Sequence, residues 1–205
     1  MDIRHTRFGP QLARSKPHRW LVTVAVAVVA LASVGAALAA TVTLTAGSLS
    51  MTAPSPAWSA TLNGLDQSVN STGTTTTVVN DSTGSGAGWH VTLSATTFTT
   101  GTDTLPTGAL TVNGNLTSAT ATTAPAATCA AGSTCTLPSG GTAVAYPLTI
   151  TTAGTSPTAF SLYSAGASSG MGTIDLATNY WMTIPANAKA GTYTSTLTFA
   201  VVSAP

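Results

Sequence analysis

The sequence holds 205 residues, of which only 5% are charged, and its formal net charge is +1. From residue 41 onward threonine fills 40 of 165 positions, and Lys189 is the single lysine or arginine beside four aspartates, Asp66, Asp81, Asp103 and Asp175. A surface that binds nucleic acid needs clustered Lys and Arg to neutralise phosphates. The composition therefore excludes nucleic acid as a partner.

The first 40 residues have the features of a secretory signal peptide. Five basic residues precede an apolar run from Trp20 to Leu38, and small residues follow at Ala39 and Ala40. A basic region, an apolar region and a small-residue site together define such a signal. We therefore expect cleavage after Ala39 or Ala40 and export of one mature domain, residues 41–205. The alternative is an uncleaved anchor, because about 20 apolar residues can span a bilayer. No second run of that length follows, so we expect no membrane span in the mature chain.

Short alternating segments separated by turn residues make up the mature chain. The clearest segment is residues 193–202, where Tyr193, Leu197 and Phe199 share one face and threonines occupy the other. β-Branched threonine suits the solvent side of a pleated strand. We also expect strands at residues 42–46, 49–53, 57–62, 74–80, 88–94, 108–117, 142–151, 159–164, 172–176 and 180–184. This pattern predicts an all-β fold, and we favour an antiparallel immunoglobulin-like β-sandwich of about eight or nine strands.

The stretch from Gly84 to Ala95, GSGAGWHVTLSA, allows two interpretations. Glycines can form a phosphate-binding loop, but such a loop opens a helix and, in the Walker form, is followed by a lysine. After Gly88 the apolar residues instead recur at every second position, beginning with Trp89. We therefore predict a strand whose Trp89 closes one end of the core, with its indole N–H on a loop carbonyl. His90 then lies on the opposite face.

Candidate catalytic and metal-binding residues are few. The segment Gly166–Gly170, GASSG, matches the Gly-x-Ser-x-Gly nucleophile pattern, and Asp175 and His90 would complete a triad. That pattern belongs to a strand-to-helix turn in an α/β fold with the histidine last in the chain, whereas here His90 comes first. The one histidine and two cysteines of the mature chain do not supply a zinc site, and no segment alternates acidic ligands as a calcium loop does. We expect no enzyme activity, no metal and no cofactor.

The two cysteines, Cys129 and Cys135, bracket the sequence Ala-Ala-Gly-Ser-Thr. An even number of cysteines in an exported chain indicates a disulfide rather than a redox or metal pair. We therefore predict a local Cys129–Cys135 disulfide that fastens the Ala- and Thr-rich loop between residues 117 and 137.

Three segments resemble the WxL-domain proteins of Gram-positive bacteria. They are Gly-Ala-Gly-Trp-His-Val at residues 86–91, Ile-Pro-Ala-Asn-Ala-Lys-Ala-Gly-Thr-Tyr at 184–193, and Leu-Thr-Phe-Ala-Val-Val-Ser-Ala-Pro at 197–205. That family consists of exported β-rich modules with two Trp-x-Leu motifs, one in the body and one near the C-terminus. The resemblance implies an exported surface protein that attaches non-covalently to the cell wall through peptidoglycan or wall polysaccharide.

The resemblance also implies which residues contact the ligand. Trp89 and Val91 match the first motif, with Val in place of Leu, and Phe199 and Val201 match the second, with Phe in place of Trp. These four side chains are the expected ligand-binding positions, and other surface proteins stay open as partners. Four further aromatic residues are candidates either for the core or for stacking on sugar rings: Trp58, Tyr163, Tyr180 and Trp181.

A second functional class competes with wall binding. The near absence of charge leaves strand edges poorly guarded against pairing with another chain. The alternating segments at residues 42–51 and 193–202 would then let the domain add a strand to its neighbour. The alternative hypothesis is therefore a self-assembling structural subunit of a surface fibre or layer.

Overall fold

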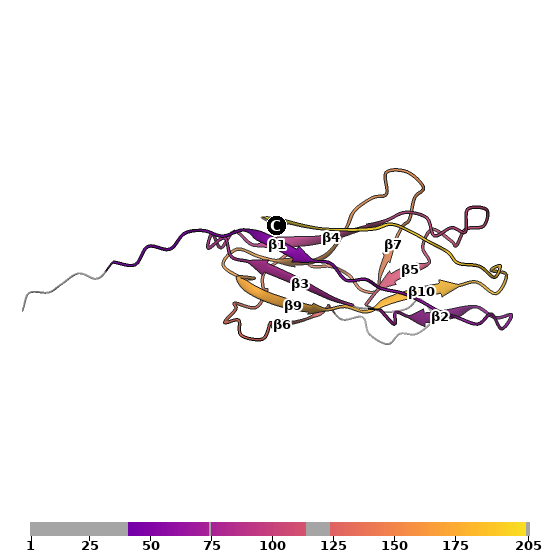
Figure 1. Ribbon diagram of the computed structural model, residues 1–205, viewed down its shortest axis with the longest axis horizontal. Helices are drawn as coiled ribbons and strands as arrows, with labels where there is room; N and C mark the ends of the chain where they lie inside the picture. Colours follow the sequence, from indigo (N-terminus) through magenta and orange to yellow (C-terminus); the bar gives the residue numbers. More distant parts are fainter. Residues whose placement is uncertain (1–40, 74, 114–123, 204–205) are drawn as a thin grey trace, which may run out of the picture. The chain divides into compact units, whose positions relative to one another are not determined.

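The computed structural model describes residues 41–73, 75–113 and 124–203 (Figure 1). The chain divides into two units, residues 1–42 and 43–205, and the fold described below is that of the second unit. Every regular element among the described residues is a β-strand. The strands are β1 (Leu49–Thr52), β2 (Gln67–Asn70), β3 (Thr76–Asp81), β4 (Trp89–Ala95), β5 (Leu110–Val112), β6 (Ala126–Cys129), β7 (Leu148–Ile150), β8 (Phe160–Ala165), β9 (Gly172–Ala177), β10 (Tyr180–Ile184) and β11 (Leu197–Ser203).

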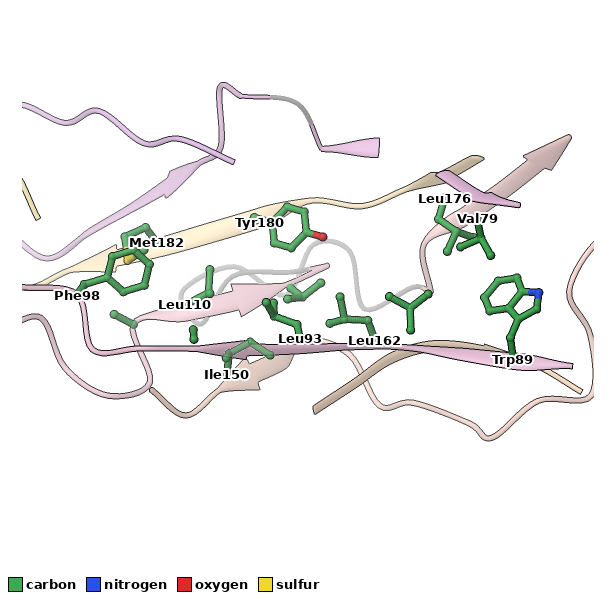
Figure 2. Close-up of a cluster of buried hydrophobic side chains, with 14 of the residues drawn as sticks. Val79, Trp89, Leu93, Phe98, Leu110, Ile150, Leu162, Leu176, Tyr180 and Met182 are labelled. Atoms are coloured by element: carbon green, nitrogen blue, oxygen red, sulfur yellow. The ribbon is translucent and has the colours of Figure 1, made fainter. Parts of the chain in front are cut away.

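The strands form three antiparallel sheets, with the orders β1-β3-β9-β6, β2-β10-β5-β7 and β11-β4-β8. In Figure 1, β4 lies on one side of the domain, and β3, β9 and β10 of the other two sheets lie on the other. Figure 2 shows Trp89 and Leu93 of β4 pointing toward Leu176 of β9 and Tyr180 of β10. Side chains from the two layers therefore meet between them, as in a β-sandwich.

Strand β4 illustrates how the sequence produces this core. Burial alternates along its seven residues, so that Trp89, Val91, Leu93 and Ala95 are buried and the residues between them are half-buried. Successive side chains of a strand point to opposite faces, and the apolar row therefore faces the second layer. Burying a large apolar side chain contributes about 1.5–3 kcal/mol, which makes this row a principal stabilising element of the domain.

The prediction of an all-β fold is confirmed. The described residues contain eleven strands, more than the eight or nine expected. The two strands that were not expected, β2 with the sequence QSVN and β6 with AATC, lack apolar alternation. Both are edge strands, and pairing with β10 and β9 fixes their positions. The immunoglobulin-like topology stays a prediction.

Three segments that we expected to be strands are not strands, and that part of the prediction is wrong. Residues 42–46, 57–62 and 193–196 alternate but lie outside the assigned strands, and only Thr194 makes an isolated bridge, with Thr99. Alternation indicates that one side of a segment is apolar and the other polar, but a β-strand also needs a neighbouring strand that hydrogen-bonds to its backbone. For the same reason β5 and β7 are shorter than the expected 108–117 and 142–151; residues 114–117 lie outside the described residues.

Candidate functional site

The two segments that resemble Trp-x-Leu motifs are neighbours in the structure. Strands β4 and β11 pair antiparallel along seven residues, with Val201 opposite Val91 and Phe199 opposite Leu93. Trp89 is opposite Ser203 at the end of the same ladder. Positions more than one hundred residues apart in the sequence therefore meet in one two-stranded unit.

All four motif side chains pack on the core side of this unit. Trp89 has 0% exposure and Val91 has 1%, whereas Phe199 and Val201 are half-buried against the core. The Phe199 ring meets the Tyr180 ring edge to face, with centroids 6.1 Å apart. These side chains hold the two layers together, and their expected role in ligand binding stays a prediction.

The predicted structural role of Trp89 is confirmed. Its indole Nε1 donates a hydrogen bond of 2.8 Å to the Gly170 carbonyl, and its ring lies 6.3 Å from the Tyr163 ring. A buried indole N–H without an acceptor would destabilise the fold by about 1–3 kcal/mol. The loop carbonyl removes that penalty, so the tryptophan closes its end of the core with every polar atom satisfied.

Two glycines make close contacts at the Trp89 end of the core, and one of them, Gly170, packs directly on the indole. A Cβ atom added at Gly170 would lie 2.5 Å from the Ala165 Cβ and 2.6 Å from the Trp89 Nε1. A Cβ added at Gly88 would lie 2.4 Å from the Ala165 carbonyl oxygen. Only glycine permits such close approach. Close packing therefore explains Gly170, which lies against the indole of Trp89, and Gly88, which lies against the backbone of residues 165–166.

The serine segment that matched a nucleophile pattern takes part in the same packing. Ser169 is buried, and its hydroxyl lies 2.8 Å from the Ser139 carbonyl and 2.9 Å from the Gly166 carbonyl. Asp175 lies in β9 and His90 in β4, strands of two different sheets. The segment has a structural explanation that requires no catalytic role.

The outward side of the sheet β11-β4-β8 is rich in hydroxyl groups. Thr92 and Ser94 alternate with the buried residues of β4, and the register places Ser161 beside Thr92 and Thr198 beside Ser94. We call these four residues the hydroxyl face. They are half-buried or exposed, and within the part of the chain that the structure describes none of their hydroxyls forms a hydrogen bond. These hydroxyls are therefore available to an external ligand.

A groove of about 810 Å³ opens beyond the start of β11. The segments 56–62 and 188–195 line it together with the buried core residues Phe98, Leu105 and Met182. Trp58, which also lines the groove, packs edge to face on Phe98 at 5.8 Å and donates its indole N–H to the Tyr180 carbonyl at 3.1 Å. We call this feature the groove.

The charged residues at the groove neutralise each other. Lys189, which lines the groove, contacts Asp103 at 2.7 Å, and their side chains are 73% and 31% exposed. The hydrogen bond from Lys189 lowers the pKa of Asp103, and the same bond raises the pKa of Lys189. The lining of the groove is therefore electrostatically close to neutral.

Sequence reasoning missed the groove, because residues 57–62 alternate and were expected to pair as a strand. The available signal was the sequence Pro54-Ser55-Pro56 immediately before them. Proline donates no backbone hydrogen bond and is found in sheets chiefly at edges. Two prolines within three residues indicate that the chain leaves the sheet after β1.

The predicted disulfide is confirmed: Cys129 and Cys135 are bonded, with Cα atoms 5.5 Å apart. The loop between them packs on β9, where the Thr173 N–H donates to the Ser133 hydroxyl at 3.1 Å. No group of three His, Cys, Asp or Glu side chains that could hold a metal ion occurs in the described residues. Within the same residues no helix has the length and apolarity needed to cross a membrane.

Comparison with known proteins gives one result. The family model described as "WxL domain surface cell wall-binding" matches residues 37–205. Neither the curated proteins nor the solved structures contain a match.

Proposed function

The chain belongs to the WxL family of cell wall-binding surface domains, and from this premise we propose that it attaches non-covalently to peptidoglycan or another wall glycan through the hydroxyl face. The observation that carries the proposal is the set of hydroxyls on Thr92, Ser94, Ser161 and Thr198, which have no partner among the described residues. Glycans present many hydroxyls in turn, and each new hydrogen bond contributes about 0.5–1.5 kcal/mol. A ladder of such contacts along a polymer would give stable attachment.

The motif residues support this assignment indirectly. Since Trp89 and Val91 are buried, a glycan reaches neither of them without opening the core. Their alternate neighbours on β4 face outward, and so do the alternate neighbours of Phe199 and Val201 on β11. In this proposal the inward motif side chains fix the β4–β11 pair, and the outward residues contact the wall.

Export through a cleaved signal peptide and maturation to a single domain complete the proposal. We assign residues 1–40 to a signal peptide and residues 41–205 to one mature domain; the family match begins at residue 37, close to the expected cleavage site. The disulfide is consistent with an oxidising compartment outside the cell. Mass spectrometry of the secreted protein checks both points: a mature N-terminus at residue 40 or 41 is expected, and retention of residues 1–39 would mean an uncleaved anchor.

Binding to isolated walls tests the hydroxyl face. The full chain is expressed in a Gram-positive secretion host, mixed with protein-free cell walls and centrifuged, and the pelleted fraction is measured against wall concentration. Thr198→Glu with Ala200→Glu places two carboxylates on outward positions of β11. Desolvating them against a glycan is costly, and we expect at least about tenfold weaker binding, equivalent to about 1.4 kcal/mol.

A matched control keeps the added charge and changes its position. Ser50→Glu with Thr52→Glu adds two carboxylates at outward positions of β1, which is also an edge strand. We expect this variant to pellet like the unmodified protein. Equal losses in both variants would mean that net charge alone weakens binding, and unchanged binding of the β11 variant would exclude the hydroxyl face as the wall-binding surface.

A further inference from the structure

The groove lies where two edge strands continue as chain outside any assigned strand. Strands β1 and β11 are edges of different sheets and contact each other. The chain that follows β1, residues 56–62, and the chain that precedes β11, residues 188–195, both line the groove. Core residues that are covered elsewhere in the sandwich are therefore reached through this opening.

Within the described part of the chain, the backbone N–H groups of residues 59–62 beside the groove are unpaired, although the Thr61 carbonyl accepts a hydrogen bond of 3.0 Å from Gln67 Nε2. Residues 59–62 are exposed and belong to no strand. Among the described residues, none accepts a hydrogen bond from the backbone N–H of Ser59, Ala60, Thr61 or Leu62. An open backbone edge beside an apolar floor is the arrangement that accepts an added β-strand.

The same chain offers a segment with the complementary pattern. Residues 41–46, TVTLTA, are exposed, carry no charged side chain and precede β1, and Val42 and Leu44 are 81% and 89% exposed. Alternation in a strand places these two side chains on one face and the threonines on the other. An exposed apolar row of this kind is uncommon in an isolated soluble domain unless another surface covers it.

The segment does not occupy the groove of its own chain, because Val42 and Leu44 are exposed. It joins the domain at Gly47, whose N–H donates to the Ser82 carbonyl at 2.9 Å. From there β1 leads toward Pro56, the first groove residue, nine residues further along, or roughly 30 Å when extended. Residues 41–46 span only about 20 Å. A strand that is added to the groove is therefore supplied by another molecule.

We infer that residues 41–46 of one copy add as a β-strand to the groove of a second copy, with Val42 and Leu44 against the floor of Phe98, Leu105 and Met182. The backbone of residues 59–62 supplies the hydrogen bonds. A segment and a groove at different places on the same chain form a head-to-tail contact, which repeats into an open chain of subunits.

The chemistry of the groove favours a strand over a glycan. A glycan would turn hydroxyls toward the floor of Phe98, Leu105 and Met182, whose side chains offer them no hydrogen-bond partner, and burying such hydroxyls is costly. An alternating strand turns apolar side chains toward the floor and its backbone toward the N–H groups of residues 59–62. The pairing of Lys189 with Asp103 also leaves no net charge at the groove, and the donor segment is uncharged. Neither side of the contact repels the other.

Complementary variants test the inference with the full chain, secreted and confirmed by mass spectrometry to retain residue 41. Val42→Asp with Leu44→Asp disables the donor, and Leu62→Asp, at a position 39% exposed, disables the acceptor. Sedimentation velocity should show concentration-dependent multimers for the unmodified protein and monomers for each variant alone. The 1:1 mixture of the two variants should give dimers that grow no further, because only one working donor meets one working acceptor.

Matched controls distinguish this contact from non-specific hydrophobic association and from wall binding. Leu65→Asp is 68% exposed and outside the groove, and it should assemble like the unmodified protein. The donor variant should keep the same thermal unfolding transition and the same binding to isolated walls. The inference is overturned if the unmodified protein stays monomeric at its highest soluble concentration, if the donor variant assembles normally, or if the mixture stays monomeric.

Discussion

The Trp89 end and the groove end of the domain each contain a tryptophan, and the two tryptophans differ in burial. At the first, Trp89 is fully buried, and the loop at Gly170 packs against its ring and accepts a hydrogen bond from its N–H. At the second, Trp58 is half-buried beside a groove that reaches down to Phe98. The motif side chains therefore stabilise the sandwich, whereas the surfaces free for binding lie outside them.

Replacing each of the two tryptophans should give the largest difference in stability between the two ends. Trp89→Ala removes a fully buried ring and leaves a cavity, so we expect a loss of about 3–5 kcal/mol in the free energy of unfolding. Trp58→Ala removes a half-buried ring and should cost about 1–2 kcal/mol. Urea unfolding followed by circular dichroism measures both, and equal losses would contradict the contrast between a closed and an open end.

Wall binding by Trp89 variants can be interpreted only when the variant remains folded. If Trp89→Ala unfolds the domain, loss of wall binding in that variant says nothing about contact between the indole and the wall. Trp89→Phe retains a ring and deletes the hydrogen bond to Gly170, at a cost of about 1–3 kcal/mol. A folded Phe variant that binds walls normally would support the purely structural role, and a folded one that binds weakly would show that the indole takes part in recognition.

Two glycines at the Trp89 end should differ in how much their replacement by alanine destabilises the domain. Both Gly170 and Gly84 have positive φ, +74° and +66°, but a Cβ at Gly84 meets nothing within 4 Å. Gly84→Ala should therefore cost only the backbone strain, about 1–2 kcal/mol. Gly170→Ala adds overpacking of Ala165 and Trp89, another 1–3 kcal/mol or so. Thermal unfolding of both variants isolates the packing contribution, and similar transition temperatures would mean that the indole end tolerates expansion.

The sequence predicted the closed end better than the open end, and the reason is physical. Trp89 begins a regular period of two after a glycine loop, and local pattern alone indicates both its burial and its need for an acceptor. That the acceptor is Gly170 depends on a contact across 81 residues, which no local pattern encodes. Residues 57–62 show the converse, because their alternation is real but their backbone has no partner strand.

The motif pair was predictable in the same partial way. Phe199 and Val201 show strand spacing in the sequence, and the structure has them on a strand. Their register with β4 depends on sheet assembly, as does the row of outward hydroxyls that joins Thr198, Ser94 and their neighbours. The sequence therefore indicated a neutral, hydroxyl-rich surface but not which residues share one face.

Removing the disulfide tests a region outside both ends. Cys129→Ser with Cys135→Ser opens a ring of only a few residues, so chain entropy predicts a loss of about 2 kcal/mol. Urea unfolding of the oxidised protein and the variant measures the difference. Because the loop also packs on β9, the variant should keep its fold and its wall binding; loss of wall binding in a folded variant would place part of the ligand site on this loop.

The smallest effect is expected at the groove, where Lys189 and Asp103 form an exposed ion pair. Since the hydrogen bond from Lys189 lowers the pKa of Asp103 below 3.8, the pair stabilises the fold above that pH, and the contribution is lost as the pH falls through the lowered value. Lys189→Gln should raise the pKa of Asp103 toward 3.8 in an NMR titration, while Lys189→Arg should keep it low. Because solvent screens the pair, neither variant should change the unfolding temperature near neutral pH by much. A large decrease would mean that the ion pair contributes substantially to the stability of this end of the domain, contrary to an open, solvent-exposed groove.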